Sequence, residues 1–298
     1  MKKASILFAL ISLALACNAQ LLWKVTGHDT CKPSYLFGTI HLETSKYIDS
    51  VPGLRAAIAN VDAVYGEVQM DSLTDNDVMM RAVKNLIAPP DSTIDKLLTK
   101  EEYQLVDSVV NSYFMGMVSL ETLSKLKPVA LSGQLGVMQM KKYFPEQLGL
   151  NDVIDVAVQA AGRELGKRIG GLETTEMQIN MLYGTPLDVQ AQELVNFCRM
   201  DNDIISFSKE LCDAYHAQDL DTLEKLFLLE EVGADEMTNE IIEKLAYERN
   251  RRWMNTITET IPRESMLVAV GAGHLVGKDG LIELLRRDGY TVEPVTLK

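Results

Sequence analysis

Strand-like segments lie mainly at the two ends of this chain, and almost everything between Glu67 and Pro262 has the pattern of helices. Short apolar and aromatic runs bounded by turn residues are typical of strands. Six runs fit this description: Leu21–Thr26, Ser34–Ile40, Val61–Val68, Arg168–Leu172, Met266–Gly271 and Tyr290–Val295. One domain with a helical insertion therefore fits the chain better than two independent units.

The order of the runs predicts an α/β fold with a small central mixed sheet. A turn-rich segment at residues 27–30 separates the first two runs, which predicts an N-terminal hairpin. At the other end, Leu281–Arg287 has a helical pattern between two runs and completes a strand–helix–strand unit. We expect residues 20–298 to form this single domain, with helices flanking the sheet and a large helical insertion at about 70–260.

Helix start signals and apolar spacing define the insertion. We predict helices at Ser92–Leu98, Lys100–Phe114, Asn151–Leu165, Ala234–Ile261 and from Pro186 through Cys212. Ser-x-x-Asp and Asn-Asp at the first and third of these suit helix N-termini, and proline suits a first helical position. The chain has no array of fixed period and no linker rich in Pro, Gly and Ser.

The first 19 residues predict export. Lys2 and Lys3 precede an apolar run at residues 4–16, followed by small residues, as in a secretory signal peptide. Cleavage after Ala19 gives a soluble protein in the periplasm or outside the cell. Cleavage before Cys17 gives a lipoprotein, but Ala14 stands where that signal prefers leucine, so we favour soluble export. No later stretch is apolar for long enough to span a membrane.

Charge and cysteine content narrow the possible partners. The formal net charge of −13 disfavours nucleic acid and anionic lipid as partners, since no long basic cluster offsets it. Without Cys17, three cysteines remain, so a disulfide leaves one thiol over. A bridge between Cys198 and Cys212 and two buried free thiols are both open. CxxC spacing is absent, which argues against a thiolate zinc site.

Four of the apolar runs end in glycine, and a histidine or glutamate follows shortly after it in the chain. They are Phe37-Gly38-Thr39-Ile40-His41, Tyr65-Gly66-Glu67, Gly170-Gly171-Leu172-Glu173 and Val270-Gly271-Ala272-Gly273-His274. In α/β sheets, ligands bind beyond the carboxyl ends of the strands, and glycine lets the backbone approach them closely. If these strands run parallel, the two histidines and two glutamates meet at one place.

Two imidazoles and two carboxylates together can hold a divalent cation or supply a base with its orienting partner. We assign His41, Glu67 and His274 as catalytic residues and as candidate metal ligands. Glu173, with the glycines Gly38 and Gly271, is assigned to substrate binding or support of the site. Each residue alone also has a structural interpretation: a loop histidine, an exposed strand end, or a helix cap for Glu173.

Arg249 and Asn250 are further catalytic candidates. They lie on the last long helix, which leads towards the strand before His274. A basic cluster with acidic flanks is usually a solvated helix face. An arginine and an asparagine here can also bind a substrate carbonyl or orient a metal-bound carboxylate. We interpret His28 and His216 as surface residues. Serine-hydrolase, phosphate-loop and His-Glu-x-x-His motifs are absent from the sequence.

At these residues the chain resembles the TraB/GumN family, which includes the Tiki metalloproteases and the pheromone-shutdown proteins. The likeness covers Leu22-Trp23-Lys24-Val25, the segment ending at His41, Glu67, Gly171-Leu172-Glu173, Glu248-Arg249-Asn250, Gly271-Ala272-Gly273-His274-Leu275, Asp279-Gly280-Leu281 and Gly289-Tyr290. By this resemblance, His41, Glu67, Arg249, Asn250 and His274 fall on the positions assigned to catalysis. Tiki-type members are described as manganese- or cobalt-dependent proteases, and the family fold is similar to that of erythromycin esterases and ChaN-like proteins.

The residues and the resemblance together predict an exported metal-dependent hydrolase that acts on a peptide or another amide or ester. A divalent ion (manganese, cobalt or zinc) would activate water, Arg249 would stabilise the oxyanion, and Asn250 would orient a partner group. Two alternatives stay open. One is a metal-independent esterase-type hydrolase with histidine as base and Glu67 as partner. The other is a binding protein that captures a small ligand or metal without turnover.

Overall fold

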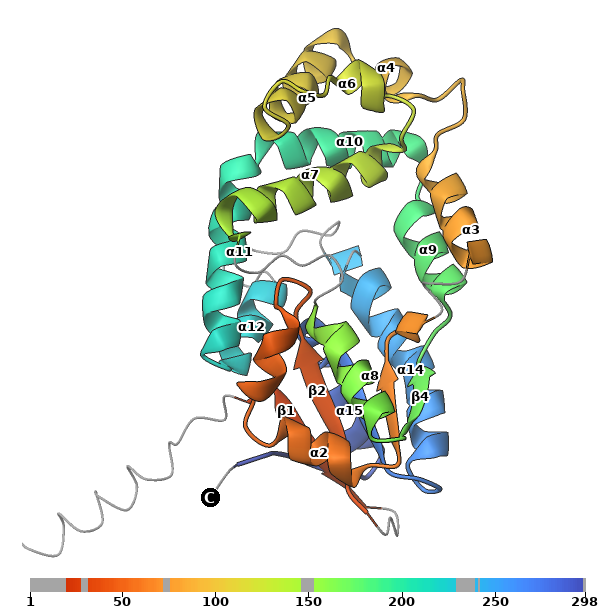
Figure 1. Cartoon of the computed structure of the whole chain (residues 1–298), viewed down its shortest axis with the longest axis vertical. Coiled ribbons are helices and arrows are strands. Elements are labelled where there is room, and N and C mark those ends of the chain that lie inside the picture. Colours follow the sequence, from red (N-terminus) through yellow and green to blue (C-terminus); the bar gives the residue numbers. More distant parts are fainter. Residues whose placement is uncertain are drawn as a thin grey trace, which may run out of the picture.

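A computed structural model of the chain describes residues 20–27, 32–71, 76–145, 153–228, 239–240 and 242–296 (Figure 1). The predicted signal peptide of residues 1–19, with Cys17, lies outside these residues, as do most of the predicted hairpin turn and Cys31. In the part of the chain that is described, no helix is long and apolar enough to cross a membrane.

Six strands form one mixed sheet in the order β4-β3-β5-β2-β1-β6. The strands are β1 (Leu22–Thr26), β2 (Ser34–Thr39), β3 (Ala63–Gly66), β4 (Arg168–Gly171), β5 (Met266–Gly271) and β6 (Thr291–Pro294). Strand β1 pairs antiparallel with β2 and β6, whereas β2, β5, β3 and β4 are parallel neighbours. The predicted α/β fold, with its small mixed sheet and N-terminal hairpin, is therefore confirmed.

The main hydrophobic cluster surrounds β5, which joins the two ends of the chain. Every residue of β5 from Met266 to Val270 is buried, as expected for a parallel strand covered on both faces. Phe37 from β2, Val64 from β3 and Trp253 from a later helix pack into the same cluster, each at most 1% exposed. Burying side chains of this size stabilises the fold by about 1.5–3 kcal/mol each, which holds N- and C-terminal strands in one sheet.

Helices cover both faces of the sheet (Figure 1). The 3-10 helix η1 (Ser45–Asp49) and helices α2 (Leu54–Asn60) and α8 (Ile154–Glu164) pack together, with α8 against β3. Helices α14 (Glu248–Thr260) and α15 (Leu281–Arg287) pack on each other. Gly162 lets α8 lie close to the sheet, because a Cβ there would stand 2.8 Å from a methyl carbon of Val64.

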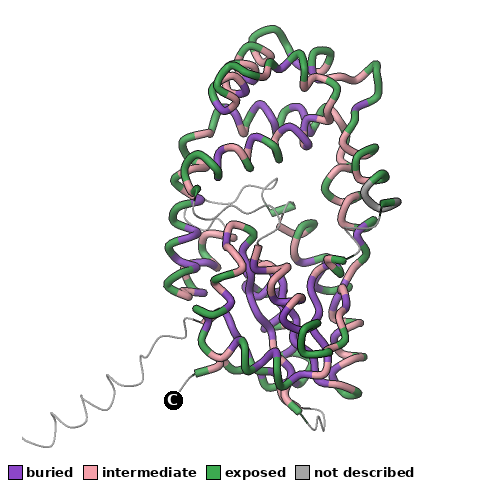
Figure 2. The backbone as a smooth tube through the Cα atoms, viewed as in Figure 1, coloured by how far each residue is buried: buried purple, intermediate pink, exposed green. Residues whose placement is uncertain are grey.

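The remaining helices are α3 (Asn76–Leu86), α4 (Ile94–Leu97), α5 (Lys100–Tyr113), α6 (Leu120–Leu123), α7 (Pro128–Tyr143), α9 (Thr175–Tyr183), α10 (Leu187–Arg199), α11 (Asp201–His216) and α12 (Leu220–Phe227). Of these, α11 and α12 contribute to the main cluster, and five others hold a second hydrophobic cluster (Figure 2). The second cluster packs α4, α5, α6, α7 and α10 together. One domain spanning residues 20–298, with an insertion at about 70–260, stays a prediction.

Local signals define some helix ends and miss others. Helix α5 begins after Thr99, which forms a capping box with Glu102. Helix α4 begins at Ile94, so the predicted start at Ser92 is two residues early. The Asn-Asp cap predicted for α8 falls on residues outside the described part of the chain. These errors are small because side-chain caps act only within one helical turn.

The predicted helix from Pro186 through Cys212 is wrong: the chain forms two helices, α10 and α11, that meet at Met200. Acidic residues at Asp201 and Asp203 in the first turn of α11 favour a new N-terminus there, since they interact well with the helix dipole. Cys198 and Cys212 are buried and form no disulfide with each other, so the alternative of two buried thiols is confirmed. Burial raises the pKa of Cys198 to about 12 and that of Cys212 to about 11.

Candidate active site

Four ionisable side chains from the sequence pattern follow four neighbouring parallel strands at one edge of the sheet. They are His41 after β2, Glu67 after β3, Glu173 after β4 and His274 after β5. Strand β2 ends level with β5, because Thr39 pairs with Gly271, and β3 ends level with β4, because Gly66 pairs with Gly171. Gly66 also pairs with Ala269, so β5 extends two residues beyond β3 at this edge. The structure therefore brings these side chains to the carboxyl edge at which parallel strands were expected to place them.

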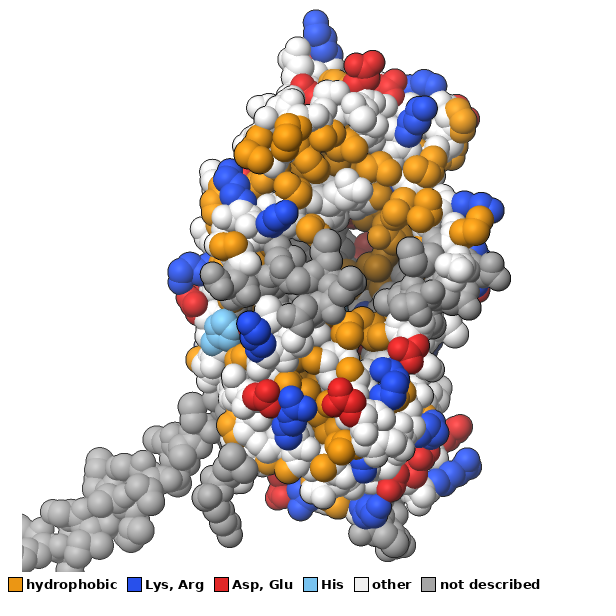
Figure 3. Space-filling view, in the orientation of Figure 1, with side chains coloured by type: hydrophobic (Ala, Val, Ile, Leu, Met, Phe, Trp, Pro, Cys, Tyr) orange, Lys and Arg blue, Asp and Glu red, His pale blue; other side chains and the backbone are white. Residues whose placement is uncertain are grey.

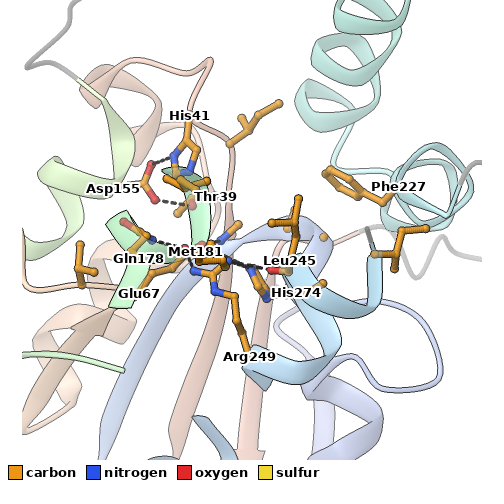
Figure 4. A pocket seen from close by; sticks show the side chains of 18 of the residues that line it. Thr39, His41, Glu67, Asp155, Gln178, Met181, Phe227, Leu245, Arg249 and His274 are labelled. Atoms are coloured by element: carbon orange, nitrogen blue, oxygen red, sulfur yellow. Dashed lines mark hydrogen bonds and ion pairs between the residues drawn. The ribbon is translucent and has the colours of Figure 1, made fainter. Parts of the chain in front are cut away.

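Arg249 lies at the centre of this group, and each N–H of its guanidinium donates a hydrogen bond (Figure 4). Nη2 donates to Glu67 Oε2 at 2.5 Å and to Glu173 Oε1 at 2.6 Å, and Nε donates to the same Glu173 carboxylate. Nη1 donates to the Leu245 carbonyl at 2.9 Å and to His274 Nε2 at 3.0 Å. Arg249 is only 5% exposed. One buried positive charge thus faces two buried carboxylates.

The side chain of Asn250 fixes the tautomer of His274. Its Nδ2 donates to the carbonyls of His274 and Asp279, at 3.0 and 2.9 Å, so its Oδ1 is the acceptor that faces the imidazole. His274 Nδ1 lies 2.8 Å from that oxygen and therefore carries the hydrogen. The lone pair of Nε2 then faces Arg249 and Glu67, whose Oε1 is 3.6 Å away. The indole of Trp253 packs on the ring at 4.5 Å between centroids.

His41 is held by a carboxylate instead. Its Nδ1 lies 3.0 Å from Asp155 Oδ2, and the other oxygen of Asp155 accepts from the Thr39 hydroxyl at 2.6 Å. The Thr39 hydrogen bond fixes Asp155, which in turn orients the imidazole with Nδ1 as donor and Nε2 directed away from the carboxylate. The His41 side chain is 72% exposed, compared with 13% for Asp155. His41 thus has one solvent-accessible ring nitrogen at the mouth of the site.

The pKa values of His41, His274 and Glu67 are all strongly shifted from their ordinary values. The hydrogen bond and negative charge of Asp155 raise the pKa of His41 to about 9. Burial lowers the pKa of His274 to about 4, and the charge of Arg249 also acts to lower it. Burial alone would raise the pKa of Glu67, but the charges of His274, Arg249 and His41 bring it down to about 2. Near neutral pH, His41 is therefore cationic, His274 neutral and Glu67 anionic.

The two predicted glycines act through their backbone and their lack of a side chain. The N–H of Gly271 donates to Glu67 Oε1 at 3.1 Å. A Cβ on Gly38 would stand 3.0–3.2 Å from atoms of Leu275 and Ala272, so a side chain there would push β2 away from the turn η5 (Ala272–His274). The Gly38 carbonyl also accepts from the buried Tyr215 hydroxyl at 2.9 Å. Both glycines therefore support the position of the histidine segments.

A cavity of about 710 Å³ lies over these residues. His41, Glu67, Asp155, Arg249 and His274 all line it, and the other described residues of its wall are mostly apolar. The wall includes η4 (Glu243–Tyr247), a π-helical segment that leads into α14. π-helical turns are frequent at functional sites. The volume lies within the range of small-molecule sites, about 300–1,000 Å³, so a short peptide segment or a small ester can enter.

By residue type the group suits a divalent cation, since imidazole and carboxylate ligate manganese, cobalt and zinc. By arrangement it does not. Arg249 bonds to both Glu67 and His274 Nε2, so a cation between them would replace the guanidinium or lie beside its positive charge. Among the described residues, no three His, Cys, Asp or Glu side chains are grouped to hold a metal ion. The residues as arranged therefore do not fit a bound metal.

Sequence reasoning missed Asp155 and Gln178. Asp155 lies in the first turn of α8, where an acidic residue is ordinary, and only its spatial position beside His41 distinguishes it. Gln178 on α9 donates to Glu67 Oε2 at 3.1 Å and to Glu173 Oε1 at 3.3 Å. His216, which was interpreted as a surface residue, is half-exposed and pairs with Glu43 away from the cavity.

Comparison with known families decides the relationship of this chain. The model of the TraB/PrgY/gumN family matches residues 21–294, which is nearly the whole described chain. The chain belongs to the TraB/PrgY/gumN family. The resemblance noted from the sequence segments around His41, Glu67, Arg249 and His274 is thereby confirmed at the level of the family.

Curated relatives of this TraB/PrgY/gumN protein are named metalloproteases. A "Metalloprotease TIKI homolog" from Amphimedon queenslandica is 24% identical and aligns with 95% of this chain and 62% of its own length. "Metalloprotease TIKI2" from Danio rerio and "Metalloprotease TIKI1" from Xenopus tropicalis are each 24% identical, over 92% and 87% of this chain and 60% and 59% of their own lengths. The chain thus spans about three fifths of these relatives. No solved structure gives a significant match.

Proposed function

We propose that this protein is an exported hydrolase that cleaves peptide bonds or closely related amide and ester bonds. The observation that carries the proposal is the meeting of His41, Glu67, His274 and Arg249 in the lining of one cavity. The names of the relatives support a peptidase-like reaction, at low identity. Export rests on the signal-peptide pattern of residues 1–19.

His41 is the proposed general base. Asp155 holds the Nδ1 of the ring, which leaves Nε2 available for proton transfer. In the neutral imidazole, Nε2 can remove a proton from water and later return it to the leaving group. A base with a pKa of about 9 is mostly protonated at pH 7, so the reaction should accelerate as the pH rises towards that value. In its protonated form, the same imidazolium attracts a developing negative charge on the substrate carbonyl.

The role first expected for Arg249 has to change. With every N–H of its guanidinium bonded to Glu67, Glu173, His274 or Leu245, it has no free donor for an oxyanion. We propose instead that Arg249 fixes Glu67 and keeps His274 neutral. Asn250 would then act as a positioning residue for His274, through the hydrogen bond at Nδ1.

Metal-dependent hydrolysis is the second candidate, favoured by the relatives that are named metalloproteases. His41, Glu67 and His274 would be the ligands, and Arg249 would first have to release Glu67 and His274. Activity that disappears after dialysis against a chelator and returns with manganese, cobalt or zinc supports this candidate. Full activity after dialysis supports the metal-independent one.

The decisive experiment uses protein without residues 1–19 on a panel of peptides and of p-nitrophenyl esters. His41→Gln should lower kcat by about 100- to 10,000-fold, the usual contribution of a general base. The matched control is His216→Gln, because His216 is also paired with a carboxylate and partly exposed but lies outside the cavity. Equal activity of the two variants would remove the proposal, and so would a folded wild-type protein that turns over no substrate.

A further inference from the structure

The cavity has a charged floor and an apolar wall. The ionisable groups of the proposed mechanism lie together at the ends of β2, β3 and β5 and the start of α14. An apolar part of the wall comes from α9, α11, α12 and residues 242–247 and includes Met181, Leu182, Leu211, Phe227, Ile242 and Leu245. Figure 4 shows Met181 and Leu245 near the charged group formed by Glu67, Arg249 and His274, with Phe227 farther to the right.

The described residues of the apolar wall offer no partner to a charged ligand group. Among the described residues that line the cavity there is no lysine, and both carboxylates are already bonded: Glu67 to Arg249 and Asp155 to His41 and Thr39. A lysine, arginine, aspartate or glutamate side chain that entered the apolar half would lose its hydration without gaining a counter-ion. The wall therefore discriminates against charged side chains.

The same wall leaves large apolar side chains in contact with water. Leu182 is 43% exposed and Leu245 is 39% exposed, although both face a cavity rather than the outer surface alone. Hydrophobic side chains also border the hollow between the sheet and the outer helices in Figure 3. Covering exposed apolar surface is favourable in proportion to its area. A ligand with a large apolar group gains from this; a small or polar one does not.

The apolar wall reaches the proposed reaction centre directly. The Phe227 ring lies so close to Gly273 that a Cβ on this glycine would stand 3.2 Å from its ring carbons. Gly273 immediately precedes His274, and the Leu245 carbonyl accepts from Arg249. An apolar group against Phe227 and Leu245 therefore lies beside His274 and Arg249, in the same cavity as the proposed base His41.

We infer that this half of the cavity is a specificity pocket for a large apolar side chain, such as leucine, methionine or phenylalanine, adjacent to the scissile bond of a peptide substrate. The inference rests on the proposed hydrolase function and adds the substrate class. Burying such a side chain instead of alanine should raise kcat/KM by about 10- to 100-fold. The gain depends on the wall residues rather than on the catalytic groups.

The test compares short acetylated peptide amides that carry leucine, phenylalanine, alanine, lysine or glutamate on either side of the scissile bond. Met181→Glu should lower kcat/KM for leucine and phenylalanine peptides at least 10-fold and raise it for lysine peptides, and Met181→Lys should favour glutamate peptides instead. A variant that is merely misfolded cannot improve on any substrate. The control is Met177→Glu, one turn earlier on α9, where the side chain is 45% exposed and outside the cavity.

A binding measurement separates this inference from the hydrolase proposal. N-acetyl-leucinamide and N-acetyl-lysinamide are titrated into wild-type protein that carries labelled methionine and leucine methyl groups. We expect N-acetyl-leucinamide alone to shift the signals of Met181, Leu182 and Leu245. Selective binding without turnover of any peptide would overturn the hydrolase and retain the pocket. Turnover with equal rates for leucine and lysine peptides would overturn the pocket assignment.

Discussion

The segments after β2 and after β5 place a histidine at the same edge of the sheet, but in opposite environments. The His41 side chain is 72% exposed and pairs with the carboxylate of Asp155. His274 is buried, bonds to the amide of Asn250 and has Arg249 at its other nitrogen. The pKa of His41 is therefore raised to about 9, whereas that of His274 is lowered to about 4.

This difference shows how one sequence pattern provides two chemical groups. Both histidines stand three residues after a glycine at the end of a parallel strand. Their partners, which come from α8 and α14, decide whether the ring carries a charge. The exposed, cationic His41 suits a proton-transfer group, whereas the buried, neutral His274 suits a structural group. Replacing Arg249 or Asp155, or changing the pH, should therefore alter the two histidines in different ways.

Removing Arg249 should have the largest effect and make the two histidines more alike. Arg249→Met removes the guanidinium that pairs with both Glu67 and Glu173, and breaking such a buried ion pair costs about 3–5 kcal/mol of unfolding free energy. The pKa of His274 should rise, because the charge of Arg249 acts to lower it. Urea unfolding and NMR titration of the histidine ring protons measure both effects.

The control for this prediction is Arg251→Met on the same helix. Arg251 is 43% exposed and pairs with Asp279 and Glu243 at the surface, so its loss should cost no more than about 1 kcal/mol. If both variants lose the same small amount of stability, Arg249 is not the group that holds the two carboxylates, and the electrostatic account of the site is wrong.

Much of this architecture could be predicted from local patterns. The apolar runs, their glycine ends and the strand–helix–strand unit at Leu281–Arg287 are visible in the sequence because strand burial and turn chemistry are local. Parallel pairing then required that the residues after these runs meet at one edge. For this reason the positions of Glu67 and His274 at this edge of the sheet could be predicted from the sequence alone.

The partners of those residues could not be anticipated in the same way. Asp155 lies in the first turn of α8, and several other helices of this chain also have an acidic residue in their first turn. The distance from Asp155 to His41 depends on how α8 packs across the sheet. Arg249 was expected to face a substrate, but its guanidinium is enclosed by Glu67 and Glu173. Such long-range packing has no periodic signal in the sequence. The partners of His41 and Arg249 can therefore be identified only in the folded structure.

The two histidines predict that stability falls on both sides of about pH 6.5. The folded pKa of His274 is lowered from 6.5 to about 4, so its contribution is present above 6.5 and is lost as the pH falls towards 4. Between pH 6.5 and 4.5 we expect a loss of about 2 kcal/mol. The folded pKa of His41 is raised to about 9, so its contribution is present below 6.5 and is lost as the pH rises to 9. The loss on this side should be smaller because His41 is exposed.

Urea unfolding at half-unit intervals from pH 4.5 to 9 tests this prediction. His216→Gln is the control, since this substitution leaves both histidine segments intact and should keep both slopes. The His41→Gln variant should lose the alkaline slope and keep an acid slope, because burial, the largest cause of the lowered pKa of His274, is unchanged. A wild-type protein whose unfolding free energy is flat between pH 6.5 and 4.5 would contradict the assignment of His274 as a buried neutral ring.

The smallest change, Asp155→Asn, should give His41 the kind of partner that His274 has. An amide still accepts a hydrogen bond from Nδ1 but carries no charge, so the pKa of His41 should fall from about 9 towards its ordinary value of 6.5. If His41 is the base, the pH at which kcat/KM is half-maximal should move down by about one to two units. Asp155→Ala removes the orientation as well and should lower the maximum rate, whereas Asp155→Asn should largely preserve it. An unchanged pH profile in Asp155→Asn would show that the group controlling the rate is not His41, because no other described side chain is hydrogen-bonded to its ring.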